Sequence, residues 1–193
     1  MVKVLLFDLG GVLEKHRFKD LSLFIEKKYG VDSLLFYNFL IDKLRLNDCC
    51  KITDKQLIEN INKKFHLKFT EKSFYVLYYK FIDSNFELLN FVKILKGKYT
   101  LAIFSNTRKK HLKESERRYS YSKIFDYVFI SQNYCTRKPE LKYYKLVLKT
   151  MHVKARDCIF IDDLERNLLP ARKLGFHCIL FKDVKHLKIA LKK

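Results

Sequence analysis

Five short apolar runs constrain the fold of this 193-residue chain most strongly, because each has the length and composition of a buried β-strand. They are Val2–Phe7, Tyr99–Phe104, Tyr127–Ser131, Cys158–Asp162 and Cys178–Phe181. Helical patterns separate the last four runs and close the chain, at Lys109–Arg118, Leu141–Met151, Asn167–Leu174 and Lys185–Leu191. Strands that alternate with helices predict an α/β fold, a doubly wound, five-stranded, parallel Rossmann-like sheet with right-handed crossovers.

Roughly ninety residues separate the first two strand-like runs, far more than an ordinary connection needs. Thr53 and Gln56 have the spacing of a capping box, and the apolar residues that follow lie on one helical face. Thr70 has the position of a second N-cap. We therefore predict an inserted helical cap subdomain at residues 14–86, with residues 1–13 and 87–193 forming the α/β core and Asn85–Lys96 as the exit helix.

The composition favours a folded, cytoplasmic protein. Hydrophobic residues make up 48% of the chain and aromatic residues 15%, which is enough for a sizeable core and argues against disorder. No stretch approaches the ~20 consecutive apolar residues of a membrane span. Asp8 interrupts the first apolar run, so the N-terminus is not typical of a signal peptide.

The formal net charge of +19 has several interpretations. Clustered Lys and Arg bind nucleic acid, and a positive field attracts small anionic substrates. The basic residues are spread along the whole chain, so compositional bias or small anions are favoured over nucleic acid. Two groups of tyrosines beside lysines resemble stacking platforms, but their helical spacing is more typical of core: Tyr75, Tyr78 and Tyr79 with Lys80, and Tyr143 and Tyr144 with Lys142 and Lys145.

Polar residues follow four of the predicted strands. Asp8 ends the first, Ser105-Asn106-Thr107 ends the second, Arg137-Lys138-Pro139 follows the third, and Asp162-Asp163 ends the fourth. Each group alone is ordinary turn or N-cap chemistry. Ligands of an open parallel sheet bind beyond the carboxyl ends of its strands, so the four groups are expected to meet at one site.

One reaction type uses all of these residue types together. Carboxylates that are close together repel one another unless a hard cation such as Mg²⁺ neutralises them. A serine hydroxyl and backbone amides hold phosphate oxygens, and a lysine ammonium offsets the charge that develops during phosphoryl transfer. A remaining carboxylate attacks phosphorus and forms an acyl phosphate.

The order and spacing of these motifs resemble those of the haloacid dehalogenase-like (HAD) hydrolase superfamily, helical-cap subclass, over essentially the full chain. Phe7-Asp8-Leu9-Gly10-Gly11-Val12 is similar to its first motif, which implies that Asp8 is the nucleophile. Ser105, with Asn106, is similar to the phosphate-binding second motif, and Lys138 to the third, which implies catalytic and phosphate-binding roles.

Ile161-Asp162-Asp163, with Asn167, resembles the fourth motif of the superfamily. The resemblance implies that Mg²⁺ is held by Asp8, Asp163 and the backbone carbonyl of Gly10, with Asp162 as an accessory acid. The form of the first motif is similar to a sugar-phosphate phosphatase branch, and to the N-terminal phosphatase domain of some epoxide hydrolases.

One departure from the superfamily pattern concerns Gly10. Most phosphatases of the superfamily carry a second Asp at this position, which protonates the leaving oxygen and then activates water. General acid–base help of this kind contributes about 10²–10⁴-fold. Glu14 or His16 are candidates to replace it, although both also suit the entry to the cap. The sugar-phosphate branch shares the Gly, so the departure does not by itself indicate an inactive enzyme.

The sequence therefore predicts a Mg²⁺-dependent phosphomonoester phosphatase that acts on a small phosphorylated metabolite through an aspartyl-phosphate at Asp8. The first alternative is a 2-haloacid dehalogenase, which would use Asp8 on carbon and need no second Asp and no metal. The second is a catalytically weak scaffold that binds nucleic acid or a protein partner, suggested by the charge and the absent acid. The sequence indicates neither the substrate nor the oligomeric state.

Overall fold

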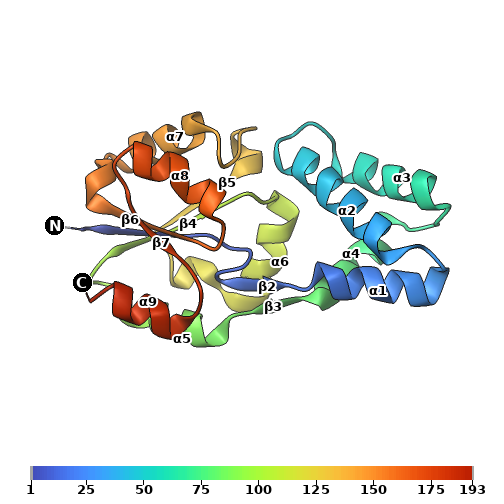
Figure 1. Ribbon diagram of the computed structural model, residues 1–193, viewed down its shortest axis with the longest axis horizontal. Helices are drawn as coiled ribbons and strands as arrows, with labels where there is room; N and C mark the ends of the chain where they lie inside the picture. Colours follow the sequence, from blue (N-terminus) through green and yellow to red (C-terminus); the bar gives the residue numbers. More distant parts are fainter. Residues whose placement is uncertain (1, 193) are drawn as a thin grey trace. The chain divides into compact units, whose positions relative to one another are not determined.

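The computed structural model describes residues 2–192, which form two compact units (Figure 1). The first unit comprises the chain up to Glu14 together with the chain from Ser84 onwards, and the second is Lys15–Asp83. Each unit buries apolar side chains of its own. The two units are therefore described separately.

The first unit is built on a five-stranded parallel sheet in the order β5-β4-β1-β6-β7. Its strands are β1 (Val4–Phe7), β4 (Thr100–Ser105), β5 (Tyr127–Ile130), β6 (Cys158–Asp162) and β7 (His177–Leu180). This confirms the predicted α/β class, with strand ends within two residues of the expected ones. Because β1 lies between β4 and β6, the strand order changes direction at β1, which is where open α/β sheets bind ligands.

Helices cover both faces of this sheet (Figure 1). On one face lie α5 (Phe86–Leu95), α9 (Val184–Ala190) and the short helix η2 (Tyr121–Lys123), and on the other α7 (Leu141–Met151) and α8 (Glu165–Lys173). The remaining elements of the unit are α6 (Lys109–Tyr119), η3 (Ser131–Asn133) and η4 (Ala155–Asp157).

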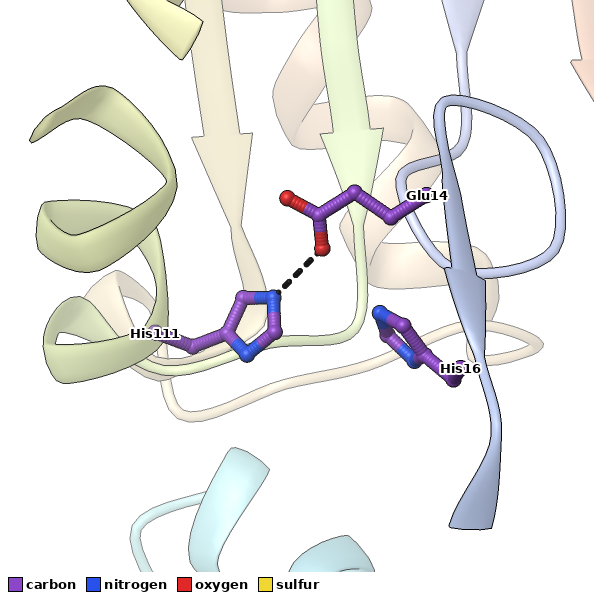
Figure 2. Close-up of side chains that lie close together, drawn as sticks. All are labelled: Glu14, His16 and His111. Carbon is purple, nitrogen blue, oxygen red and sulfur yellow. Dashed lines mark hydrogen bonds and ion pairs between the residues drawn. The ribbon is translucent and has the colours of Figure 1, made fainter. Parts of the chain in front are cut away.

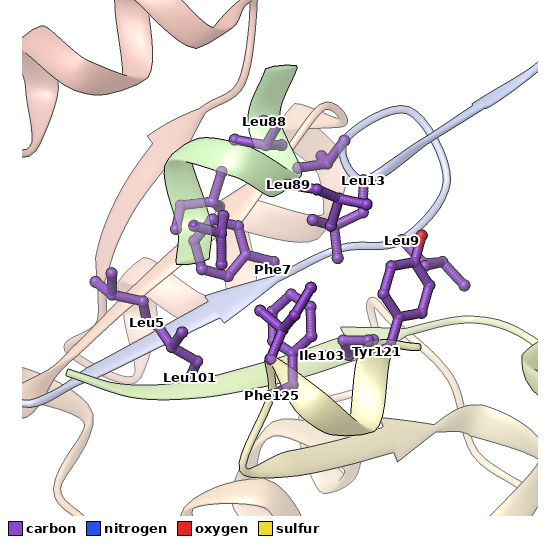
Figure 3. Close-up of a cluster of buried hydrophobic side chains, with 14 of the residues drawn as sticks. Leu5, Phe7, Leu9, Leu13, Leu88, Leu89, Leu101, Ile103, Tyr121 and Phe125 are labelled. Atoms are coloured by element: carbon purple, nitrogen blue, oxygen red, sulfur yellow. The ribbon is translucent and has the colours of Figure 1, made fainter. Parts of the chain in front are cut away.

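The alternation of side chains along β1 explains why the sheet needs two layers of helices. Leu5 and Phe7 point into the core under α5 and α9 (Figure 3), while Val4 and Leu6 point into the core under α7 and α8. All four side chains are at most 1% exposed. Burial on both faces is why the strands are continuous apolar runs in the sequence.

The second unit is helical. It contains α1 (Phe18–Tyr29), α2 (Ser33–Asp48), α3 (Asp54–Phe65), α4 (Glu71–Tyr78) and the short helix η1 (Tyr79–Phe81), which pack around one cluster of buried side chains. Thr53 and Gln56 form the predicted capping box of α3, and Thr70 caps α4 as expected. The chain passes between the units through β2 (Glu14–His16) and β3 (Ile82–Ser84). These two short strands pair with each other and were not expected from the sequence pattern.

The tyrosines considered as a stacking platform are core residues. Tyr75, Tyr78 and Tyr79 are at most 9% exposed in the second unit, and Tyr143 and Tyr144 are fully buried in the first. None of these rings is available to stack on a nucleotide base. Within residues 2–192, no helix has the length and apolar character needed to cross a membrane.

Candidate active site

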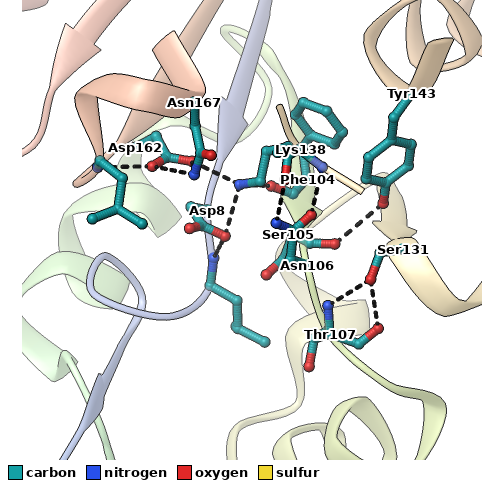
Figure 4. A network of polar contacts seen from close by, with 12 residues as sticks. Asp8, Phe104, Ser105, Asn106, Thr107, Ser131, Lys138, Tyr143, Asp162 and Asn167 are labelled. Carbon is teal, nitrogen blue, oxygen red and sulfur yellow. Dashed lines mark hydrogen bonds and ion pairs between the residues drawn. The ribbon is translucent and has the colours of Figure 1, made fainter. Parts of the chain in front are cut away.

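The parallel register of three central strands brings the predicted motifs together. Phe7 at the end of β1 pairs with Ile103 of β4 on one side and with Ile161 of β6 on the other. The amide of Asp8 donates a hydrogen bond to the carbonyl of Ile161, at 2.9 Å. Asp8 therefore lies level with Asp162, the last residue of β6, at the carboxyl edge of the sheet (Figure 4).

Lys138 lies at the centre of this group of residues and is fully buried. Its Nζ lies 2.7 Å from Asp162 Oδ2 and 3.0 Å from Asp8 Oδ1, and it donates to the Phe104 carbonyl at 2.9 Å. All three donors of the ammonium group are therefore used. Burial alone lowers the pKa of Lys138, but the charges of Asp162 and Asp8 outweigh it and raise that pKa above its ordinary value. Lys138 is therefore held as a cation.

Asn106 fixes the backbone of Lys138. Its Oδ1 accepts from the Lys138 amide at 2.7 Å, and its Nδ2 donates to the Lys138 carbonyl at 2.9 Å. Ser105, the last residue of β4, is 2% exposed, and its carbonyl accepts from the Tyr143 hydroxyl at 3.2 Å. The next turn is fixed by Ser131, whose hydroxyl bonds both the amide and the carbonyl of Thr107.

Asp162 accepts hydrogen bonds on both carboxylate oxygens. The Leu164 amide donates to Oδ1 at 2.9 Å, and the Asn167 side-chain amide lies 3.0 Å from each oxygen. The Tyr144 hydroxyl donates in turn to the Asn167 carbonyl at 2.7 Å. With Lys138 also on Oδ2, this carboxylate is held by protein donors. The arrangement suits an anchor for Lys138 better than a direct metal ligand.

Three carboxylates gather at this edge of the sheet. One oxygen from each of Asp8, Asp162 and Asp163 lies within 4.8 Å of the others. Burial, together with the charges of Asp162 and Asp163 and against the attraction of Lys138, raises the pKa of Asp8 to about 7. Carboxylates this close repel one another when they are ionised, and a hard divalent cation offsets that repulsion.

Gly11 sits against the Asp163 carboxylate. Its φ is +83°, a left-handed conformation that favours glycine. A Cβ atom at this position would lie 2.2 Å from Asp163 Oδ2. The second glycine of the Gly10-Gly11 pair is thus required both by the backbone and by its close approach to a carboxylate.

Some of these contacts were not predictable from the sequence motifs. The roles of Tyr144 and Ser131 had no signal in the sequence, because tyrosines at helical spacing are typical of core and a lone serine after a strand is common. Glu14, considered above as a replacement acid, is completely buried, and both of its oxygens are engaged by His111 and Tyr121. This geometry does not suit a group that must reach a substrate.

A doubly wound sheet with a nucleophile-type Asp, a Lys and paired acids at its strand ends defines a class of α/β hydrolases. The family model for haloacid dehalogenase-like hydrolases matches residues 32–181. The chain belongs to this family of enzymes, as the sequence motifs indicated.

Relatives of known activity match short parts of the chain. Bifunctional epoxide hydrolase 2 of Rattus norvegicus is 40% identical over 62 residues, which is 32% of this chain and 11% of that protein. The sesquiterpene phosphatase astK of Aspergillus oryzae is 38% identical over 52 residues, which is 27% of this chain and 26% of that protein. The matches thus span between about a tenth and a quarter of these proteins.

Solved structures resemble the chain over almost its full length. A predicted HAD-like family hydrolase of Porphyromonas gingivalis has a TM-score of 0.84 at 22% identity, covering 100% of this chain and 99% of that one. A HAD family enzyme of Bacteroides thetaiotaomicron, in complex with magnesium and inorganic phosphate, has a TM-score of 0.77 at 24% identity, covering 97% and 99%. L-2-haloacid dehalogenase of Xanthobacter autotrophicus has a TM-score of 0.70 at 16% identity, covering 100% and 83%. These similarities show the fold.

Proposed function

We propose that the protein is a Mg²⁺-dependent phosphomonoester phosphatase that acts on a small phosphorylated metabolite through an aspartyl-phosphate at Asp8. The main support for this proposal is that the two oxygens of the Asp8 carboxylate have different surroundings. Oδ1 accepts from the Leu9 amide at 2.7 Å and contacts Lys138, whereas no described residue bonds to Oδ2. One oxygen fixes the side chain and the other is available to attack phosphorus.

The residues around Asp8 fit a magnesium ion. The cluster offers carboxylate oxygen atoms, which are the ligands that Mg²⁺ prefers in proteins. We propose Asp8, Asp163 and the Gly10 carbonyl as ligands, with Asp162 as an accessory acid that acts mainly by holding Lys138. When bound, Mg²⁺ neutralises the phosphate charge and orients the phosphoryl group.

The chain's own residues account for the transfer step. Asp8 Oδ2 forms a bond to phosphorus while the bond from phosphorus to the leaving oxygen breaks, and the ammonium of Lys138 offsets the charge on the transferring group. We propose that Ser105 and Asn106 hold the phosphate oxygens, and that Asn106 also positions Lys138. Water then hydrolyses the acyl phosphate and regenerates Asp8.

The glycine at position 10 shapes the expected substrate dependence. No carboxylic acid stands there to protonate the leaving oxygen, so the rate should depend strongly on how good the leaving group is. We expect aryl phosphates to be hydrolysed faster than alkyl phosphates.

Hydrolysis of 4-nitrophenyl phosphate with and without Mg²⁺ tests the proposed function. We expect wild-type protein and Asp42→Asn, whose carboxylate is exposed, to be active, and Asp8→Asn to be inactive. Acid-quenched wild-type protein should carry one phosphoryl group by mass spectrometry, and Asp8→Asn none. Equal activity of Asp8→Asn and wild type would overturn the proposal. Release of halide from 2-chloropropionate without metal would favour the dehalogenase alternative instead.

We further propose that the helical unit Lys15–Asp83 is the cap that selects the substrate. Its support is the separate buried core and its position in the chain between β1 and α5, where a cap is inserted in one HAD subclass. A screen of phosphorylated metabolites, repeated with the unit exchanged for that of a relative, should change the preferred substrate. An unchanged preference would contradict this role.

A further inference from the structure

A buried carboxylate–imidazole pair lies in the first unit, and the proposed transfer step does not use it (Figure 2). Glu14 is 0% exposed and His111 is 1% exposed, and Glu14 Oε2 lies 2.7 Å from His111 Nε2. The Tyr121 hydroxyl donates to the other oxygen, Oε1, at 3.3 Å. Burying such groups is unfavourable unless they are paired, so the three side chains form one interdependent cluster.

The backbone of Glu14 closes the loop that follows Asp8. The Glu14 amide donates to the Leu9 carbonyl at 2.7 Å, and the Gly11 amide donates to the Glu14 carbonyl at 2.7 Å. The loop therefore begins one residue after the nucleophile and is fastened at Glu14. A displacement of the Glu14 backbone would therefore also displace the backbone of Gly10 and Gly11.

Through Gly11, the same loop also contacts Asp163, a member of the carboxylate cluster. Gly11 approaches Asp163 so closely that a Cβ atom would overlap the carboxylate. His111 belongs to α6, the helix that follows the Ser105–Thr107 turn. Glu14 thus links the loop after the nucleophile to the helix behind the proposed phosphate-binding turn.

We propose that the Glu14–His111 pair is a brace that positions Gly10 and Gly11 relative to Asp163, and so sets the affinity of the site for Mg²⁺. This inference rests on the proposed function for the identity of the metal. Both residues are positioning residues, because their side chains bond to each other and to Tyr121 within the core. The brace acts through backbone geometry, and its effect should appear in metal binding before it appears in substrate binding.

Calorimetric titration of the whole protein with Mg²⁺ tests the brace. We expect Glu14→Gln and His111→Ala each to weaken Mg²⁺ binding about tenfold or more, the usual effect of losing an outer partner of a metal site. The double variant should lose little more than the worse single variant, because the two residues act as one contact. Excess Mg²⁺ should restore activity with an unchanged KM. Glu59→Gln, an exposed glutamate paired with Lys55, is the control and should bind as wild type.

The signs of the two effects separate geometry from charge. If Glu14 acted only through its charge, Glu14→Gln would weaken Mg²⁺ binding and His111→Ala would not, and that result would overturn the brace. Unchanged affinity in a folded Glu14→Gln protein, which keeps the shape of the side chain, would also overturn it, even if His111→Ala does not fold. Wild-type protein that binds Mg²⁺ but hydrolyses no phosphate ester would refute the proposed function alone. If wild-type protein binds no Mg²⁺, the proposed effect on metal affinity is overturned, and hydrogen exchange at the Gly11 amide tests the positioning of the loop alone: faster exchange in Glu14→Gln supports that positioning, and unchanged exchange rejects it.

Discussion

Replacing Gly11 with alanine isolates the contact between the nucleophile loop and Asp163. The new Cβ would lie 2.2 Å from Asp163 Oδ2, whereas ordinary contacts begin at 3.4 Å, so the carboxylate or the loop must retreat by about 1.2 Å. Gly97→Ala is a matched control, because Gly97 has a φ of +84°, against +83° for Gly11, and nothing lies within 4 Å of its added Cβ. The two variants share the backbone strain and differ in the clash.

The expected losses of stability and of rate follow from the backbone strain and from the clash, respectively. A left-handed alanine costs about 1–2 kcal/mol, which for a chain of this length lowers Tm by about 2–4 °C per kcal/mol in both variants. A misplacement of about 1 Å in a catalytic group reduces rate about 100-fold, and only Gly11→Ala should show this loss. Gly11→Ala should also bind Mg²⁺ more weakly, whereas Gly97→Ala should bind it as wild type does.

Thermal unfolding, Mg²⁺ calorimetry and hydrolysis of an aryl phosphate measure the three quantities on the same preparations. Comparing the variants at a temperature at which both are fully folded removes the shared strain from the activity data. If Gly11→Ala and Gly97→Ala lose stability equally and both keep wild-type Mg²⁺ affinity and rate, the assigned role of the Gly11–Asp163 contact is wrong.

Three further perturbations concern the same cluster. Burial and the neighbouring carboxylates raise the pKa of Asp8 to about 7, so Mg²⁺ must displace a proton from Asp8 at lower pH. The dissociation constant of Mg²⁺ should therefore rise roughly tenfold per pH unit below about pH 7. A constant Mg²⁺ affinity from about pH 8 to about pH 5.5 would contradict this. The stability of the metal-free protein depends on pH in the opposite direction to Mg²⁺ affinity. A carboxyl whose pKa is raised in the folded state stabilises the fold when it is protonated, so the contribution of Asp8 to the free energy of unfolding falls as pH rises through about 7. Denaturant unfolding at several pH values measures this change. Lys138→Met should lose activity and about 3–5 kcal/mol of metal-free stability, yet bind Mg²⁺ at least as tightly, because a cation has been removed from the site. Weaker Mg²⁺ binding by calorimetry would contradict this electrostatic effect. Asn106→Ala removes two hydrogen bonds to the Lys138 backbone, so urea unfolding should show a loss of about 1–3 kcal/mol together with a lower kcat, and a wild-type kcat would rule out a positioning role.

Local patterns in the sequence were sufficient for the strands of the five-stranded sheet, for several helices and for the order of the motifs. Short runs such as Val2–Phe7 predicted β1 because both faces of a central parallel strand are buried, so the apolar pattern is unbroken. The capping residues Thr53 and Thr70 predicted the starts of two helices because an N-cap interaction spans only three residues. The short strands β2 and β3 escaped prediction because three residues carry too little periodicity to identify a strand.

The sequence alone determined which residues stand at the strand ends, because a parallel sheet gathers those ends at one edge whatever its side-chain packing. Tertiary structure decided what each residue does there. Asn106 meets Lys138 across 32 positions, and Glu14 meets His111 across 97. Such contacts depend on strand register and on side-chain conformations fixed by the packed core, and neither leaves a periodic signal in the chain. The closeness of Gly11 to Asp163 is of the same kind: the sequence supplied a glycine and an acid, and only the fold placed one against the other.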